Sequence, residues 1–143
     1  MKKIMISALF VFALVMITGC GSSKSTKLVC TQSVQGVDVE FNVLFEGNKI
    51  TKMDFNYNMN LSEYDDSEID MLASQDFCTA IKGSMEEYED AFTNCKQEVA
   101  NKTLKIKSDL DVDKIAKTEL EKMESPSNAK TELEAQGYSC KEA

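Results

Sequence analysis

Cysteine is the residue type in this chain with the widest chemical scope. The five cysteines are Cys20, Cys30, Cys78, Cys95 and Cys140. A thiol can carry a lipid, form a disulfide, bind a metal or attack a substrate, and its surroundings decide which. Cys20 differs from the other four because it directly follows a long apolar run. We therefore consider it first.

The segment before Cys20 has the features of an export signal. Two lysines precede residues 4–17, which are apolar at every position except Ser7. A helix of these residues would be about 21 Å long, short of the roughly 30 Å hydrocarbon core of a bilayer. Such a length is typical of a cleaved signal peptide rather than a spanning helix. We expect residues 1–19 to be removed.

The sequence Ile17-Thr18-Gly19-Cys20 resembles the bacterial lipobox, with Ile17 in place of the commoner Leu. The resemblance implies a diacylglyceryl group on the Cys20 thiol and cleavage between Gly19 and Cys20. Two acyl chains give a stable anchor, because each buried CH₂ contributes about 0.8 kcal/mol. We expect a protein anchored by lipid to the extracytoplasmic face of the cell membrane, with residues 20–27 as a flexible leash. The alternative is a secreted protein with a chance cysteine.

Composition limits the partners and the size of the exported part. Removing residues 1–19 from the 143 leaves 124, enough for one domain, which we place at residues 28–143. The whole chain carries 16 lysines and 24 acidic residues, and two of the lysines precede residue 4, so the mature charge is −10. Such acidity argues against nucleic acid and anionic headgroups as partners.

Few residues are suited to catalysis or to metal binding. The chain has no histidine, so acid–base or nucleophilic chemistry through imidazole is excluded. Ser127 and Lys130 match the S-x-x-K pattern of penicillin-binding enzymes, but the partner motifs S-D-N and K-T-G are missing. The acidic cluster between Glu63 and Asp70 lacks the central glycine of a calcium-binding EF-hand loop. We expect no enzyme activity, no metal and no cofactor.

The first half of the domain has the alternation of β-strands. Residues 28–33 form a first expected strand, and residues 37–45 alternate apolar and polar side chains most clearly. A turn at Gly47 and Asn48 leads to a third strand over residues 50–61. Its apolar residues change phase after Ile50, which predicts a β-bulge near Thr51 and Lys52.

The second half mixes helices with a hairpin. Residues 63–93 predict two helical pieces, with capping boxes beginning at Ser62 and Ser84 and a stop at Gly83. Residues 95–108 predict a hairpin that turns at Asn101 and Lys102. A helix over 112–123, capped by Asp109 or Asp111, precedes one that starts at Ser125-Pro126 and ends at Gly137. Residues 138–140 predict a short last strand or an extended tail.

This order, β-β-β-α-β-β-α-β, predicts an α+β fold in which helices pack on one side of an antiparallel sheet. Four cysteines in an exported domain indicate two disulfides, and sequence alone allows three pairings. We favour Cys30–Cys140, which would join the first and last strands, together with Cys78–Cys95, which would join a helix to the next strand. Metal binding fits poorly, because the chain has no C-x-x-C motif.

The turn Gly47-Asn48-Lys49-Ile50-Thr51-Lys52, the lipobox, the late hairpin and Gly137-Tyr138 before the last strand together resemble the YehR-like small bacterial lipoproteins. The likeness spans most of residues 20–141. This family has no known function and brings no catalytic residues. The resemblance implies the architecture and the membrane location.

Two hypotheses about function follow. The first is a non-enzymatic binding or structural module at the cell envelope, whose protein or small-ligand partner the sequence does not identify. The second is a carrier of a small apolar or lipid ligand held between helix and sheet. The aromatic residues that could line such a pocket are Phe55, Tyr57, Tyr64, Phe77 and Tyr88, although stripes of this kind more often form a core.

Overall fold

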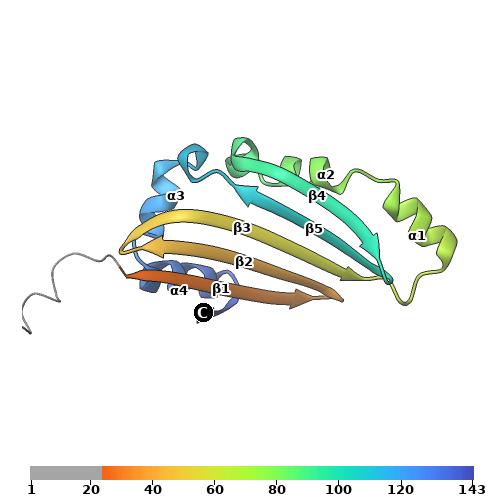
Figure 1. Ribbon diagram of the computed structural model, residues 1–143, viewed down its shortest axis with the longest axis horizontal. Helices are drawn as coiled ribbons and strands as arrows, with labels where there is room; N and C mark the ends of the chain where they lie inside the picture. Colours follow the sequence, from red (N-terminus) through yellow and green to blue (C-terminus); the bar gives the residue numbers. More distant parts are fainter. Residues whose placement is uncertain (1–23) are drawn as a thin grey trace, which may run out of the picture.

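The computed structural model describes residues 24–143 and shows one six-stranded antiparallel sheet with helices on one of its faces (Figure 1). The strand order across the sheet is β4-β5-β3-β2-β1-β6. The strands are β1 (Ser25–Val34), β2 (Val37–Glu46), β3 (Lys49–Asn60), β4 (Phe92–Ala100), β5 (Thr103–Leu110) and β6 (Ser139–Glu142). The α+β class and the antiparallel sheet are therefore as predicted. Residues 1–23, which contain the predicted signal and Cys20, lie outside the described part.

Short helical pieces connect and cover the strands. Between β3 and β4 lie α1 (Asp66–Ala73), α2 (Phe77–Ser84) and the 3₁₀ helix η1 (Glu86–Ala91). Between β5 and β6 lie the 3₁₀ helix η2 (Val112–Lys114), α3 (Lys117–Lys122) and α4 (Pro126–Ala135). The order differs slightly from the prediction because each predicted helical stretch is divided into more pieces. Within residues 24–143, no helix is both long and apolar enough to cross a bilayer.

Alternation along the strands sends one set of side chains toward the helices. Cross-strand pairs such as Val43 with Met53 and Phe41 with Phe55 place apolar residues of neighbouring strands on the same face. The predicted bulge is confirmed: Leu44 pairs with Lys52 and Phe45 with Ile50, so one extra residue is accommodated on β3. The bulge restores the phase, so that Ile50 is also buried.

The core consists of two clusters on this one face. The larger contains Leu28, Phe45 and Met53 from the sheet and Met123 and Leu133 from the helical segments after β5. The smaller is built on Leu61, Leu104 and Ile106 and is covered by α1 and α2. In Figure 1, α1 lies at one end of the long axis, α2 lies nearer the middle, and α3 and α4 lie toward the other end. The two helical groups thus cover different parts of the sheet.

Three local predictions were wrong in detail. The N-cap of α1 is Asp65, whose side chain accepts from the backbone N of Glu68, so the capping box starts three residues after Ser62. The helix does not stop at Gly83, since α2 continues to Ser84, and η1 begins without a side-chain cap. The first strand starts at Ser25, three residues before the expected start, because its backbone pairs with β2 from there on. Residues 25–27 of the predicted leash therefore belong to β1.

Candidate functional site

The two disulfides are the first feature that the structure assigns. Cys30 and Cys140 are register partners on β1 and β6, with their Cα atoms 4.0 Å apart. Cys78 on α2 and Cys95 on β4 form the second bridge, with their Cα atoms 5.8 Å apart. Both favoured pairings are confirmed. The first attaches a four-residue edge strand to the sheet, and the second fixes α2 against β4.

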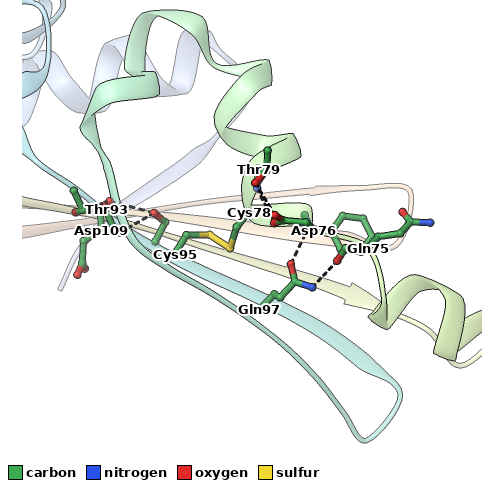
Figure 2. The surroundings of a disulfide bond; sticks show 10 residues. Gln75, Asp76, Cys78, Thr79, Thr93, Cys95, Gln97 and Asp109 are labelled. Carbon is green, nitrogen blue, oxygen red and sulfur yellow. Dashed lines mark hydrogen bonds between the residues drawn. A yellow bond between two sulfur atoms is a disulfide. The ribbon is translucent and has the colours of Figure 1, made fainter.

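Side chains close to the Cys78–Cys95 disulfide stabilise the break between α1 and α2 (Figure 2). The side chain of Gln97 on β4 accepts from the backbone N of Phe77 at 2.9 Å and donates to the carbonyl O of Gln75 at 2.6 Å. These bonds satisfy backbone groups at the junction of α1 and α2. The Asp76 carboxylate caps α2 through Thr79, and the hydrogen bond from the Thr79 side chain is the main reason why the pKa of Asp76 is lowered.

The second feature is an apolar cavity of about 110 Å³ between the sheet and the helices. Phe41, Met53 and Phe55 of the sheet line it from one side. Other apolar contributions come from the ends of β4 and β5 and from the segments that cover this part of the sheet. They are Met85, Tyr88, Phe92, Leu110, Met123, Leu133 and Tyr138. Three methionines in the lining make the surface adaptable, because an unbranched thioether chain fills irregular spaces.

Polar side chains of α3, of α4 and of the C-cap of α4 border the cavity. They are Glu119, Lys122, Glu132 and Gln136. Glu119 accepts from Lys122 Nζ at 2.8 Å and from the Tyr88 hydroxyl at 3.2 Å. The hydrogen bond from Lys122 is the main reason why the pKa of Glu119 is lowered, so this carboxylate is ionised at neutral pH. Burial raises the pKa of Tyr138, so its phenol stays neutral.

The aromatic residues singled out from the sequence divide between the two clusters. Phe55 and Tyr88 line the cavity. Tyr57, Tyr64 and Phe77 pack instead against the smaller cluster. No local pattern in the sequence indicates the polar border, because α3 and α4 reach this part of the sheet only through the tertiary fold.

The other sequence candidates lie at the surface. Ser127 and Lys130 are exposed on α4, where Lys130 lies 3.9 Å from Glu134 as an ion pair. In the acidic cluster, Asp65 and Glu68 bond each other's backbone N in the capping box of α1. Within residues 24–143, no group of three or more His, Cys, Asp or Glu side chains is placed to hold a metal ion.

No family model and no curated protein matches the chain. Among solved structures, the NMR structure of a protein from Streptococcus pneumoniae TIGR4 is similar, with 14% sequence identity and a TM-score of 0.45. The match covers 85% of this chain and 87% of that one. A likeness of this strength supports no inference about function.

Proposed function

We propose that this protein is a lipid-anchored binding module at the extracytoplasmic face of the cell membrane, and that it is not an enzyme. The observation that carries the proposal is the pair of disulfides, Cys30–Cys140 and Cys78–Cys95. Such bonds persist in oxidising compartments and are rare in the cytosol. The predicted export signal over residues 1–19, followed by Cys20, is the feature of the sequence that fits the same location.

The resemblance to the YehR-like lipoproteins supports the proposed membrane location, and we use it for nothing else. The case against catalysis rests on side-chain chemistry. A chain without histidine lacks the side chain that most often transfers protons near neutral pH. Cysteines held in disulfides supply no thiolate nucleophile. Binding needs neither group.

Metabolic labelling with a radioactive fatty acid tests the anchor. Cells expressing the full chain should yield a labelled band, and Cys20→Ala should abolish the label and leave the longer precursor. Ser23→Ala is the matched control, because it alters the leash without changing the lipobox. Label on the Cys20→Ala variant would refute acylation at this residue.

The apolar cavity favours a second candidate function, the binding of a small apolar ligand. Its volume of about 110 Å³ limits that ligand. An engineered protein cavity of about 150 Å³ binds benzene, and drug-sized ligands occupy pockets of about 300–1,000 Å³. The candidate is therefore a receptor for one ring or one short branched chain, and a complete membrane lipid is too large for the space.

Methionine methyl groups provide a direct test of this second candidate. Met53, Met85 and Met123 line the cavity, whereas Met71 is 60% exposed on α1 and serves as an internal reference. Titration of ¹³C-methyl-methionine protein with toluene should shift the three lining signals and leave Met71 unchanged. Equal shifts at all four positions, or none at saturating toluene, would rule out a ligand site here.

A pair of substitutions on α4 and its C-terminal end makes the test specific. Gln136→Phe places a ring at the border of the cavity and should weaken the toluene response. Glu134→Phe adds the same ring at an exposed position that does not line the cavity, so the response should persist. A response that survives Gln136→Phe unchanged would place the ligand elsewhere.

A further inference from the structure

The position of Lys24, the first residue that the structure describes, indicates which end of the domain lies next to the proposed anchor. The carbonyl O of Lys24 accepts from the backbone N of Gly47 at 2.9 Å, and Ser25 pairs with Glu46. The start of β1 is thus held against the turn between β2 and β3. Only Gly21, Ser22 and Ser23 separate Cys20 from Lys24.

If Cys20 carries the lipid, this spacing keeps Lys24 close to the membrane surface. Four Cα-to-Cα steps span at most about 14 Å when fully extended. The twelve residues of β3, at about 3.3 Å each, carry the sheet about 40 Å away from the same turn. The leash is therefore much shorter than the domain. It holds the end with the β2–β3 turn near the headgroups.

We propose that this end, formed by Lys24, the turn Gly47-Asn48 with Lys49, and the segment 112–117, is a surface that contacts the phospholipid headgroups. The inference rests on the proposed lipid anchor and adds the orientation of the domain. A groove of about 410 Å³ joins the turn to η2 and the start of α3, with Ile50 and Ile115 in its floor. Its charged lining residues are Lys49, Lys117, Asp113 and Glu124.

The acidity of the whole chain opposes an anionic leaflet, so the contact depends on exposed lysines at this end. Lys49 and Lys117 border the groove together with Asp113 and Glu124. Lys49 is exposed, and the Lys117 side chain, 3.9 Å from Glu121, is 90% exposed, so both lysines can reach lipid phosphates. At the opposite end, residues 53–81 contain no lysine, and the neighbouring β4–β5 turn contributes Lys102. The acidic residues there are Glu63, Asp65, Asp66, Glu68 and Asp70, and α1 lies at the opposite end of the sheet from the start of β1 (Figure 1).

The chain contains no tryptophan, so one introduced tryptophan is an unambiguous fluorescent reporter of depth. Asn48→Trp places it on the β2–β3 turn, and Glu63→Trp places it at the opposite end as the matched control. The acylated mature protein is reconstituted into phosphatidylcholine vesicles with 30% phosphatidylglycerol and a headgroup spin label. We expect several-fold stronger quenching of the Asn48→Trp reporter. Equal quenching, or stronger quenching of Glu63→Trp, would overturn the orientation.

Two further readouts separate the possible failures. Intact mass establishes whether the protein carries acyl chains, and an unacylated protein would refute the proposed anchor itself. An acylated protein with the wrong quenching pattern refutes only the orientation. The double variant Lys49→Gln/Lys117→Gln should reduce the quenching gained from phosphatidylglycerol, whereas Lys102→Gln/Lys105→Gln should not. Equal effects of both double variants would overturn the lysine contact.

Discussion

Removal of each disulfide should destabilise the domain by an amount that depends on the number of residues in the loop that the disulfide closes. The Cys30–Cys140 bridge joins residues 110 positions apart, and the Cys78–Cys95 bridge joins residues 17 positions apart. In the loop-entropy relation these separations correspond to about 4.8 and about 3.1 kcal/mol of stabilisation. Closing the short bridge first shortens the long loop and lowers the larger value by only about 0.2 kcal/mol.

Side-chain packing should increase the difference in stabilisation between the two disulfides. Cys30 is fully buried and Cys140 is 8% exposed, whereas Cys78 and Cys95 border the smaller cluster at partly exposed positions. Replacing the buried pair with alanine removes apolar contacts in the larger cluster as well as the cross-link. Both effects act in the same direction for Cys30→Ala/Cys140→Ala.

Urea unfolding without reductant measures the effect. The mature chain with Cys20→Ser serves as the reference, because it has no odd thiol. We expect Cys30→Ala/Cys140→Ala to lower the free energy of unfolding by at least about 1.5 kcal/mol more than Cys78→Ala/Cys95→Ala does. Equal losses, or a larger loss from the short bridge, would refute the argument from loop length.

Three other predictions concern turns, caps and pH. Asn101 and Lys102 both have positive φ, +52° and +53°, so Lys102→Gly should raise stability by about 0.5–1 kcal/mol, and a lower urea midpoint would contradict this. Ser125 caps α4 by accepting from the N of Asn128, so Ser125→Ala should cost about 1 kcal/mol, whereas Ser127→Ala, at an exposed position of α4, should cost almost nothing. The lowered pKa of Glu119 gives stability that is present above its ordinary pKa of 4.5 and is lost as pH falls through the lower folded-state pKa. Glu119→Gln should therefore flatten the decline in the unfolding midpoint below pH 4.5, and an unchanged acid profile would exclude this contribution.

The sheet was predictable because its signals are local. Residues 37–45 alternate with period two, and the phase change after Ile50 marked the bulge that the pairing of Phe45 with Ile50 confirms. The favoured disulfides followed from assigning Cys30 and Cys140 to the first and last strands. These inferences needed only the periodicity of apolar residues along the sequence and the order of the helices and strands.

Long-range contacts decided what the sequence did not show. The break between α1 and α2 depends on Gln97, which lies about twenty residues downstream and bonds to Gln75 and Phe77. The early start of β4 at Phe92 accompanies a register shift around Asn94, whose φ of +52° no local pattern indicated. The cavity required helices α3 and α4 to be placed over Phe41 and Phe55.

The link between β1 and β6 also determines how the domain bears mechanical load. Only residues 25–29 of β1 precede Cys30, and Ala143 lies three residues after Cys140. Tension between the two ends of the chain passes through the sulfur–sulfur bond, so residues 31–139 form a covalent loop outside the path of the force. Pulling can peel away the first few residues of β1, but the rest of the sheet is not unravelled from either end while the bridge is intact.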